Sequence, residues 1–346
     1  MLKALENNSK KIVDIFLNYF FAPVLFCWLS YSIFIQIKQQ PDLQVRWVLI
    51  KQSITSLQGA WILLTVFCLM IVNWSFEAQK WKLSIRSVQP LGFFKSFCAV
   101  LSGVSFSVTT PNRTGEYLGR MLYMNEGNRL KIISLTIVSG ISQLIITLFT
   151  GLLGLLFIHR SMLTGHIVQD LGGSLWLRVL EWGVLLVLIS LTLFYFKLSF
   201  LVNLVNKWKN TKWYYLVSSL RELNATLAFR LLSLSAARYI VFIIQYFLLL
   251  RLFEVNINWW NTFAVVSVIF LVLAIIPSFT IAELGLRGGV SLYLLGSFST
   301  NHAGIGMTAA AVWMINLVIP AVVGSLLILR IKIVKNRNEK IFNSSV

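Results

Sequence analysis

The chain has 346 residues, of which 57% are hydrophobic and 12% are charged, and its mean hydropathy is +0.78. Soluble domains carry about 25% charged residues, so this composition excludes an ordinary soluble protein and indicates a membrane protein. The formal net charge of +18 could suggest nucleic acid, but the basic residues flank apolar segments, so we expect anionic lipid headgroups as partners and no nucleic acid.

The apolar segments, in chain order, predict crossings and shorter pieces, because a full crossing of the bilayer needs about 20 residues. Segments 93–110 and 284–298 are short and rich in Ser, Thr and Gly, which predicts half-membrane pieces. Segment 259–277 could cross alone, but together with 284–298 it predicts a second hairpin around Pro277. The predicted crossings are residues 15–36, 58–76, 132–158, 182–202, 232–253 and 305–330.

These segments predict an all-α polytopic membrane protein with about six transmembrane helices and two re-entrant, broken-helix elements. We expect residues 1–346 to form a single membrane-embedded domain. Its first half, about 12–158, contains the hairpin 93–125, and its second half, about 182–335, contains the hairpin 259–298. Most Lys and Arg fall on one side when the N-terminus is cytoplasmic, so both termini are expected inside. The hairpins then open to opposite faces, as in an inverted repeat.

A polar motif occurs once in each predicted hairpin. It runs from Pro111 to Arg120 and again from Pro277 to Arg287, with proline, threonine, leucine and glycine at identical offsets. A charge at the bilayer centre costs roughly 2.5 to more than 10 kcal/mol, so the glutamate and arginine of each copy predict a functional site. The predicted substrate-binding residues are Arg113, Glu116, Arg120, Arg238, Gln245, Glu283 and Arg287, and the predicted helix-breaking tips are Pro111, Gly115, Pro277 and Gly285.

Carboxylates and guanidiniums paired in a low-dielectric cavity can serve two purposes. Spare arginine donors could hold a phosphate in bidentate fashion, while Glu116 or Glu283 could complement a cationic headgroup or change protonation during transport. The alternative is that the pairs are internal salt bridges that only hold the hairpins in place. Arg238 and Gln245, seven positions apart on one face of a crossing, are expected as further partners.

Other residues give weaker signals. Asn73, Glu77 and Lys80, at i, i+4 and i+7, form a second polar stripe, which we interpret as a cap at the inner membrane interface. Most tryptophans lie near the ends of predicted spans and are interpreted as an aromatic belt. The three cysteines lie in separate apolar segments, so we expect no disulfide.

The acidic residues restrict the possible chemistry. There are twelve, and no two lie within seven positions of each other, so no DxD or DDxxD cluster can hold a divalent metal. The P-loop pattern for ATP is missing as well. We expect no metal, no cofactor and no catalytic residue, and these features argue against an enzyme without deciding the question.

The run Pro111-Asn112-Arg113-Thr114-Gly115-Glu116, with the stretch from Asn73 to Trp81 before it and the element from Pro277 to Gly289 after it, resembles the lysylphosphatidylglycerol synthase transmembrane family. The similarity to this family, also called flippase-like, covers about residues 12–335. The resemblance implies a polytopic protein of the bacterial cytoplasmic membrane that handles lipids and has two re-entrant elements. In one branch of the family such a region moves aminoacylated phosphatidylglycerol between leaflets, and a fused soluble domain synthesises it. The 346 residues contain no such domain, so no synthase activity is expected.

Together these observations favour flippase-like translocation of a phospholipid or a lipid-linked anionic substrate, without an ATPase of its own. The alternative is an accessory or catalytic subunit that modifies a lipid-linked substrate, and a third hypothesis is a scaffold. The expected partners are anionic or aminoacylated phospholipids, or a polyprenyl-phosphate carrier, with a separate soluble enzyme as a possible further partner.

Overall fold

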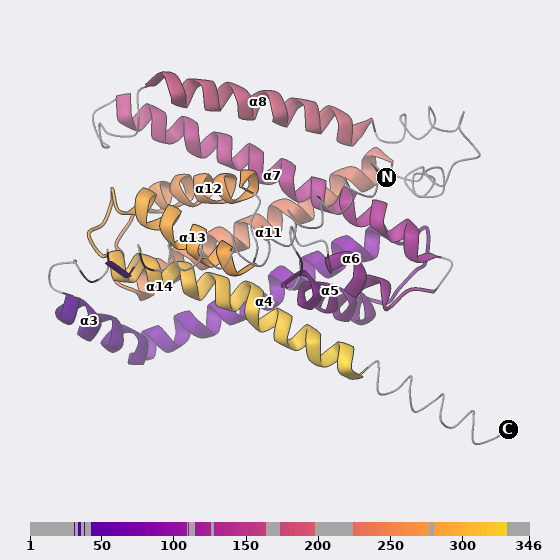
Figure 1. Ribbon diagram of the computed structural model, residues 1–346, viewed down its shortest axis with the longest axis horizontal. Helices are drawn as coiled ribbons and strands as arrows, with labels where there is room; N and C mark the ends of the chain where they lie inside the picture. The colour runs from indigo at the N-terminus through magenta and orange to yellow at the C-terminus, as the bar shows by residue number, and fades with distance from the viewer. Residues whose placement is uncertain are drawn as a thin grey trace, which may run out of the picture. The chain divides into compact units, whose positions relative to one another are not determined.

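The computed structural model describes residues 43–108, 115–125, 128–163, 174–197, 224–276 and 280–330, together with the single positions 31, 34, 35, 38 and 110. Within this part of the chain the regular secondary structure consists of helices, with no strand, which confirms the all-α prediction. The helices shown in Figure 1 are α3 (Leu43–Thr55), α4 (Leu57–Ser84), α5 (Phe93–Val108), α6 (Gly115–Met121), α7 (Arg129–Leu163), α8 (Ser174–Phe196), α11 (Ala225–Leu252), α12 (Trp259–Ile275), α13 (Thr280–Leu295) and α14 (His302–Trp313), followed by the π-helical segment η6 (Met314–Val318).

Five helices in the described ranges are long and apolar enough to cross a membrane. They are Leu57–Ser84, Lys131–Arg160, Leu175–Phe196, Ala225–Leu252 and His302–Arg330. Helix α8 illustrates why the surface suits lipid, since Trp176 and Trp182 remain 76% and 70% exposed. The spans confirm a multi-pass membrane protein and five of the predicted crossings, whereas the crossing predicted at 15–36 lies largely outside the described residues.

Helix α3 was not predicted from the apolar pattern. It precedes the first described span and packs against α14. Ser56 separates α3 from α4, and its hydroxyl accepts a hydrogen bond from the backbone N–H of Gly59 at 2.9 Å. This is an N-terminal cap, which satisfies a donor that the first turn of α4 leaves unpaired. The chain therefore restarts as a new helix instead of extending α3.

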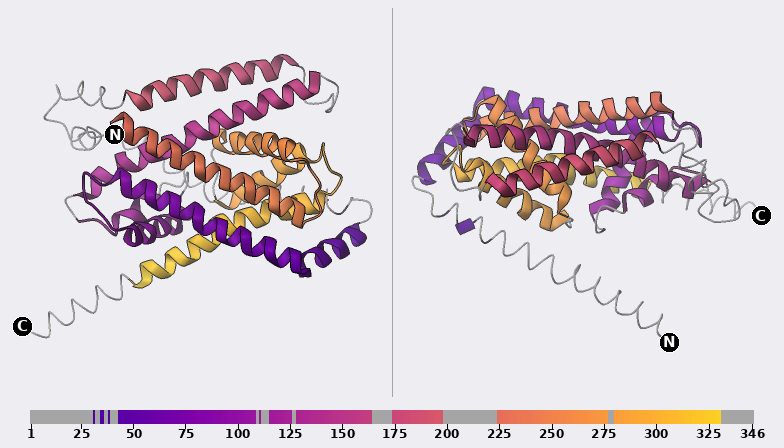
Figure 2. Two further views of the ribbon diagram at one scale, coloured as in Figure 1. Left: turned by 180° about the vertical axis from the view of Figure 1, so that it is seen from behind. Right: turned by 90° about the horizontal axis from the view of Figure 1, so that it is seen from above.

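Two pairs of short helices correspond to the predicted hairpins. Helices α5 and α6 pack side by side, and so do α12 and α13, which are orange in Figure 2. The backbone of Ile276 is extended at the end of α12, as expected for the residue before a proline. The breaks in both helical elements confirm the prediction, although Pro111 and Pro277 themselves lie outside the described residues.

Glycines allow α5 and α6 to approach closely. A Cβ atom on Gly119 would lie 2.3 Å from the carbonyl oxygen of Ser102, and one on Gly115 would lie 2.2 Å from that of Phe106. On the facing helix, a Cβ atom on Gly103 would lie 2.9 Å from the carbonyl oxygen of Glu116. Small residues four positions apart are the usual way to bring membrane helices into backbone contact. This contact fixes α6, which carries two of the predicted site residues.

The described residues form two compact units. Unit 1 contains the described residues up to Cys68, Thr147–Val184 and Ile243–Trp313, and unit 2 contains Leu69–Ile146, Leu185–Phe242 and the described residues from Met314 onward. The α5–α6 hairpin belongs to unit 2 and the α12–α13 hairpin belongs to unit 1. The single domain and the convergence of the two hairpin tips stay predictions.

Candidate functional site

Glu77, in the last third of α4, is the centre of a buried charged cluster in unit 2. Its side chain is 7% exposed, and its Oε1 accepts a hydrogen bond from Nη2 of Arg120 at 2.9 Å. Its Oε2 accepts from Nη1 of Arg238 and lies 3.1 Å from Nζ of Lys80. One carboxylate therefore joins α4 to α6 and α11. We call Glu77, Lys80, Glu116, Arg120 and Arg238 the Glu77 cluster.

Arg120 is fully buried at 0% exposure, yet only part of its hydrogen-bonding capacity is used. Its Nη2 donates to Glu77 and also to Oε1 of Glu116, one turn earlier on α6. Its guanidinium carbon lies 5.8 Å from the ring centre of Trp81. The Nε and Nη1 atoms, both buried, have no hydrogen-bond partner within the described residues. Such donors are costly to bury, which makes them candidates for binding a ligand.

Arg238 of α11 is held by the amide side chain of Asn73 on α4, which is linked in turn to Asn316. Its Nε donates to Oδ1 of Asn73 at 2.9 Å, and Nδ2 of Asn73 is 3.4 Å from Oδ1 of Asn316. Asn316 lies in η6, four residues before Pro320. Proline has no N–H to bond to the carbonyl four positions back and clashes with it, so the helix widens there. The resulting π-helical turn places the Asn316 side chain beside the cluster.

Lys80 links the cluster to hydroxyl groups on neighbouring helices. Its Nζ donates to Oγ of Ser235 at 3.2 Å, and that hydroxyl is 2.9 Å from Oγ of Ser142 on α7. One turn further along α4, Oγ of Ser84 donates to the carbonyl oxygen of Lys80 at 2.9 Å. All four residues are buried. A connected polar path therefore runs from Glu77 through Lys80 and Ser235 to Ser142, and Ser84 lies one turn beyond Lys80 on α4.

Positive charge exceeds negative charge in the Glu77 cluster. With every group ionised, its three basic side chains and two carboxylates leave a net charge of +1. Charge is costly to bury without compensation, and the cost falls when an anion joins the group. Glu116 is 30% exposed, whereas the other four side chains are 10% exposed or less. The side of the cluster at Glu116 is therefore the accessible one.

The second motif forms a smaller site in unit 1. Nη2 of Arg287 donates to Oε1 of Glu283 at 2.9 Å, one turn apart on α13, and we call these two residues the Glu283 pair. Both are buried, and the guanidinium carbon of Arg287 lies 5.7 Å from the ring centre of Phe270 on α12. One carboxylate faces one guanidinium, so the pair is balanced in charge.

The other predicted site residues have different positions. Gln245 belongs to unit 1, where its Nε2 donates to the carbonyl oxygen of Val66 at 3.0 Å. Gly115 begins α6, but Gly285 lies inside α13, so its assignment as a helix-breaking residue is wrong. Membrane helices tolerate glycine, and the break occurs before Thr280. Arg113 lies outside the described residues, as do both prolines of the motif.

The interpretation of Asn73, Glu77 and Lys80 as an interfacial cap is wrong. Their exposed fractions are 0%, 6% and 1%, because the stripe faces α6 and α11 inside unit 2. Trp74 and Trp81 are also buried, against arginines, and do not belong to an aromatic belt. The sequence did contain the signal, since a polar stripe at i, i+4 and i+7 inside an apolar segment marks one helix face.

The described residues contain no group of three or more His, Cys, Asp or Glu side chains that could hold a metal ion. In unit 1, Nδ1 of His159 on α7 lies 2.8 Å from Oε1 of Glu181 on α8. This contact joins two spans. The chemistry available at the Glu77 cluster is therefore that of guanidinium, ammonium and carboxylate groups, which bind charged ligands.

The family model described as the lysylphosphatidylglycerol synthase TM region matches residues 43–324. The chain belongs to this family. The match includes both hairpins and every residue of the Glu77 cluster, and it confirms the resemblance that the motif residues indicated. Neither the curated proteins nor the solved structures contain a match to the chain.

Proposed function

We propose that this protein moves a lipid with an anionic, phosphate-bearing headgroup between the leaflets of the bacterial cytoplasmic membrane, without hydrolysing ATP itself. The observation that carries the proposal is the excess positive charge of the buried Glu77 cluster. A phosphate would neutralise this charge and accept the hydrogen bonds that Nε and Nη1 of Arg120 do not make within the described residues. The name of the matched family, which refers to a phospholipid, supports the same class of substrate.

In this proposal Glu116 is the residue that a headgroup displaces. It shares Nη2 of Arg120 with Glu77, but it is the more exposed of the two carboxylates. A phosphate that reaches Arg120 from this side would take the place of Glu116, while Glu77 holds Arg120, Arg238 and Lys80 in position. A headgroup that also bears an amine, as in an aminoacylated phospholipid, would then pair with the released Glu116 carboxylate.

We assign the Glu283 pair to the second half of the transport cycle. The motif recurs on α13, and an inverted repeat would open the two hairpins to opposite faces of the membrane. Arg287 would bind the phosphate in this half of the cycle, with Gln245 of the same unit as a further contact, and Arg113 stays a predicted contact of the first motif. The proposed orientation has both termini in the cytoplasm, as the distribution of Lys and Arg favours.

The proposal is tested by transport of fluorescent phosphatidylglycerol in proteoliposomes, measured as the rate at which dithionite bleaches label from the inner leaflet. Glu116→Gln removes the carboxylate that competes with the phosphate for Arg120, so the lipid should be released more slowly and transport should slow about tenfold, because one charge-assisted hydrogen bond contributes about 1.5–3 kcal/mol. Arg287→Ala should also slow it.

Glu181→Gln is the matched control, since it makes the same chemical change at a carboxylate that contacts His159. Its transport rate should equal that of the wild type. Normal transport by both Glu116→Gln and Arg287→Ala would contradict the proposed mechanism, and a wild-type protein without transport activity would contradict the proposed function.

A second candidate function is a subunit that helps to modify a lipid-linked substrate, either an aminoacyl-phospholipid or a polyprenyl phosphate. The family name supports it, because it refers to the membrane region of a synthase. Membranes that contain the protein, a soluble extract and a labelled donor would then form a modified lipid. A transporter instead changes the leaflet in which the lipid resides and leaves its covalent structure intact.

A further inference from the structure

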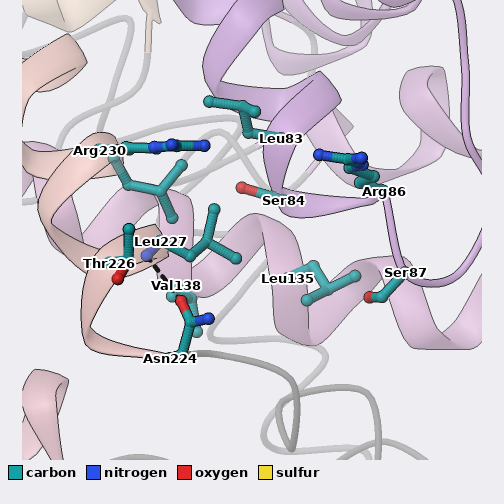
Figure 3. Close-up of a pocket in the computed structure, with 11 residues that line it drawn as sticks. Leu83, Ser84, Arg86, Ser87, Leu135, Val138, Asn224, Thr226, Leu227 and Arg230 are labelled. Atoms are coloured by element: carbon teal, nitrogen blue, oxygen red, sulfur yellow. Dashed lines mark hydrogen bonds between the residues drawn. The ribbon is translucent and has the colours of Figure 1, made fainter.

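A cavity of about 470 Å³ lies within unit 2, between the C-terminal end of α4, the first part of α7 and the beginning of α11 (Figure 3). Its volume is in the range of small-ligand sites and suits a headgroup better than a whole lipid. The cavity is lined by Leu83, Ser84, Arg86, Ser87, Leu135, Val138, Asn224, Thr226, Leu227, Arg230 and Leu231. Its lining residues include two arginines and no acidic residue.

The two arginines give the cavity a positive charge. Figure 3 shows Arg86 and Arg230 on opposite sides of the cavity, with Leu83 and Ser84 between them. Both arginines are exposed, and neither forms an ion pair with a carboxylate in the part of the chain that the structure describes. Two guanidiniums with free donors can bind one phosphate from two directions.

The N-terminus of α11 adds to this positive potential. The side-chain oxygen of Asn224 accepts the backbone N–H of Leu227 at 2.8 Å, which caps the helix at the wall of the cavity. The first turn of a helix carries a partial positive charge and unpaired N–H groups, both of which favour an anion. The positive end of the α11 helix dipole therefore lies at the cavity and adds to the charge of the two arginines.

The cavity lies one helical turn from the polar path of the Glu77 cluster. Ser84, Val138 and Leu231 line it, and each is four positions from a residue of that path, namely Lys80, Ser142 and Ser235 respectively. Four residues of helix span about 6 Å. On all three helices, therefore, the next turn inward carries the connected ammonium and hydroxyl groups, and Glu77 precedes Lys80 by three positions on α4.

We propose that this cavity is the first docking site for the phosphate group of a lipid headgroup, before the phosphate moves to the Glu77 cluster. Arg86 and Arg230 bind the phosphate, and Leu83, Leu135 and Leu227 contact the glycerol and the first acyl carbons. These leucines favour a lipid over a free phosphate ester. Docking of the transported lipid rests on the proposed function, whereas the binding itself can be measured separately.

The experiment uses the full chain in detergent and measures dissociation constants by native mass spectrometry for three probes. The probes are dihexanoyl phosphatidylglycerol, glycerol 3-phosphate and uncharged dihexanoylglycerol. Arg86→Gln and Arg230→Gln should each raise the dissociation constant for the phospholipid about tenfold, because each removes a charge-assisted hydrogen bond. Arg230→Lys should restore part of the affinity, and Arg178→Gln, an exposed arginine on α8 in unit 1, should leave it unchanged.

The three probes separate the sources of the phosphate. We expect glycerol 3-phosphate to bind more weakly than the phospholipid and to lose affinity in the same variants, and dihexanoylglycerol not to bind. Equal affinity for glycerol 3-phosphate and the phospholipid would overturn the lipid assignment. Unchanged phospholipid affinity in the Arg86→Gln, Arg230→Gln double variant would overturn the site.

Transport assays on the same variants distinguish this inference from the proposed function. If the wild type transports no lipid but the arginine variants lose phospholipid binding, then the proposed function is wrong and the binding site stands. If Glu116→Gln slows transport while the double variant binds and transports normally, then the docking site is wrong and the proposed function stands.

Discussion

The two copies of the motif have the same local geometry but different surroundings. In each, an arginine donates to a glutamate one turn earlier on a short helix, Arg120 to Glu116 in unit 2 and Arg287 to Glu283 in unit 1. Arg120 also reaches Glu77 on a long span, which brings in two more basic groups. The motif therefore supplies a pair, and the neighbouring long helices decide whether this pair becomes part of a larger site.

The charge balance separates the two sites in a way that bears on function. The Glu77 cluster has one positive charge in excess, whereas the Glu283 pair contains one charge of each sign. An anion that displaces Glu116 from Arg120 still leaves all three basic groups of the cluster paired with Glu77, whereas an anion that displaces Glu283 leaves Arg287 without its carboxylate. The alternative reading of the motif as a structural salt bridge therefore fits the Glu283 pair better than the Glu77 cluster.

The largest effect is expected from removal of the central carboxylate. Glu77→Gln leaves Lys80, Arg120 and Arg238 with a single remaining carboxylate, and loss of one partner from a buried ion pair costs about 3–5 kcal/mol. The apparent melting temperature in detergent should therefore fall strongly, together with transport.

Glu283→Gln is the matched change in unit 1. Glu283→Gln removes the carboxylate from one basic group, the Arg287 guanidinium, whereas Glu77→Gln removes it from three. The melting temperature should therefore fall less for Glu283→Gln. An equal or larger fall for Glu283→Gln would contradict the distinction between the two sites. Measurement of tryptophan fluorescence during heating compares both variants with the wild type under identical conditions.

A smaller effect is expected from separating α6 from α5. In Gly119→Ala the new methyl group would lie 2.3 Å from the carbonyl oxygen of Ser102, so α6 must shift and carry Arg120 away from Glu77. Overpacking of this kind costs about 1–3 kcal/mol. The melting temperature and the transport rate should both fall, the latter because Arg120 is displaced.

Gly140→Ala is the control, because a Cβ atom there meets nothing within 4 Å and the residue lies in α7. Alanine is favoured over glycine inside a helix by about 0.5–1 kcal/mol, so this variant should be as stable as the wild type or slightly more so. If Gly119→Ala behaved like Gly140→Ala, close packing of α5 on α6 would not be what holds Arg120 in place.

The broken helices and the i, i+4 charge pairs could be predicted from the sequence because they depend on local chemistry. A proline inside a helix ends or distorts it, and residues four positions apart meet on any helix. The partners of these pairs could not be predicted. Arg120 and Glu77 are 43 positions apart, and Arg238 and Glu77 are 161 apart, so only tertiary packing brings them together. The polar stripe on α4 was visible, but its direction, inward or toward the interface, depends on the same packing.

The smallest effect on stability is expected from Lys80→Met, which tests the excess charge directly. Methionine matches the length of the buried lysine stem, and the change brings the cluster to a net charge of zero. Oε2 of Glu77 still accepts from Arg238, and Oγ of Ser235 still contacts Ser142, so no buried polar group of this path loses its last partner. Stability should therefore stay within about 1 kcal/mol of the wild type, as for other substitutions that leave no group unpaired. The affinity for dihexanoyl phosphatidylglycerol and the transport rate should nevertheless fall, because the neutral cluster attracts an anion less strongly. A loss of stability as large as that of Glu77→Gln would mean that the third positive charge is required for folding, and the contrast with the balanced Glu283 pair would then not reflect ligand binding.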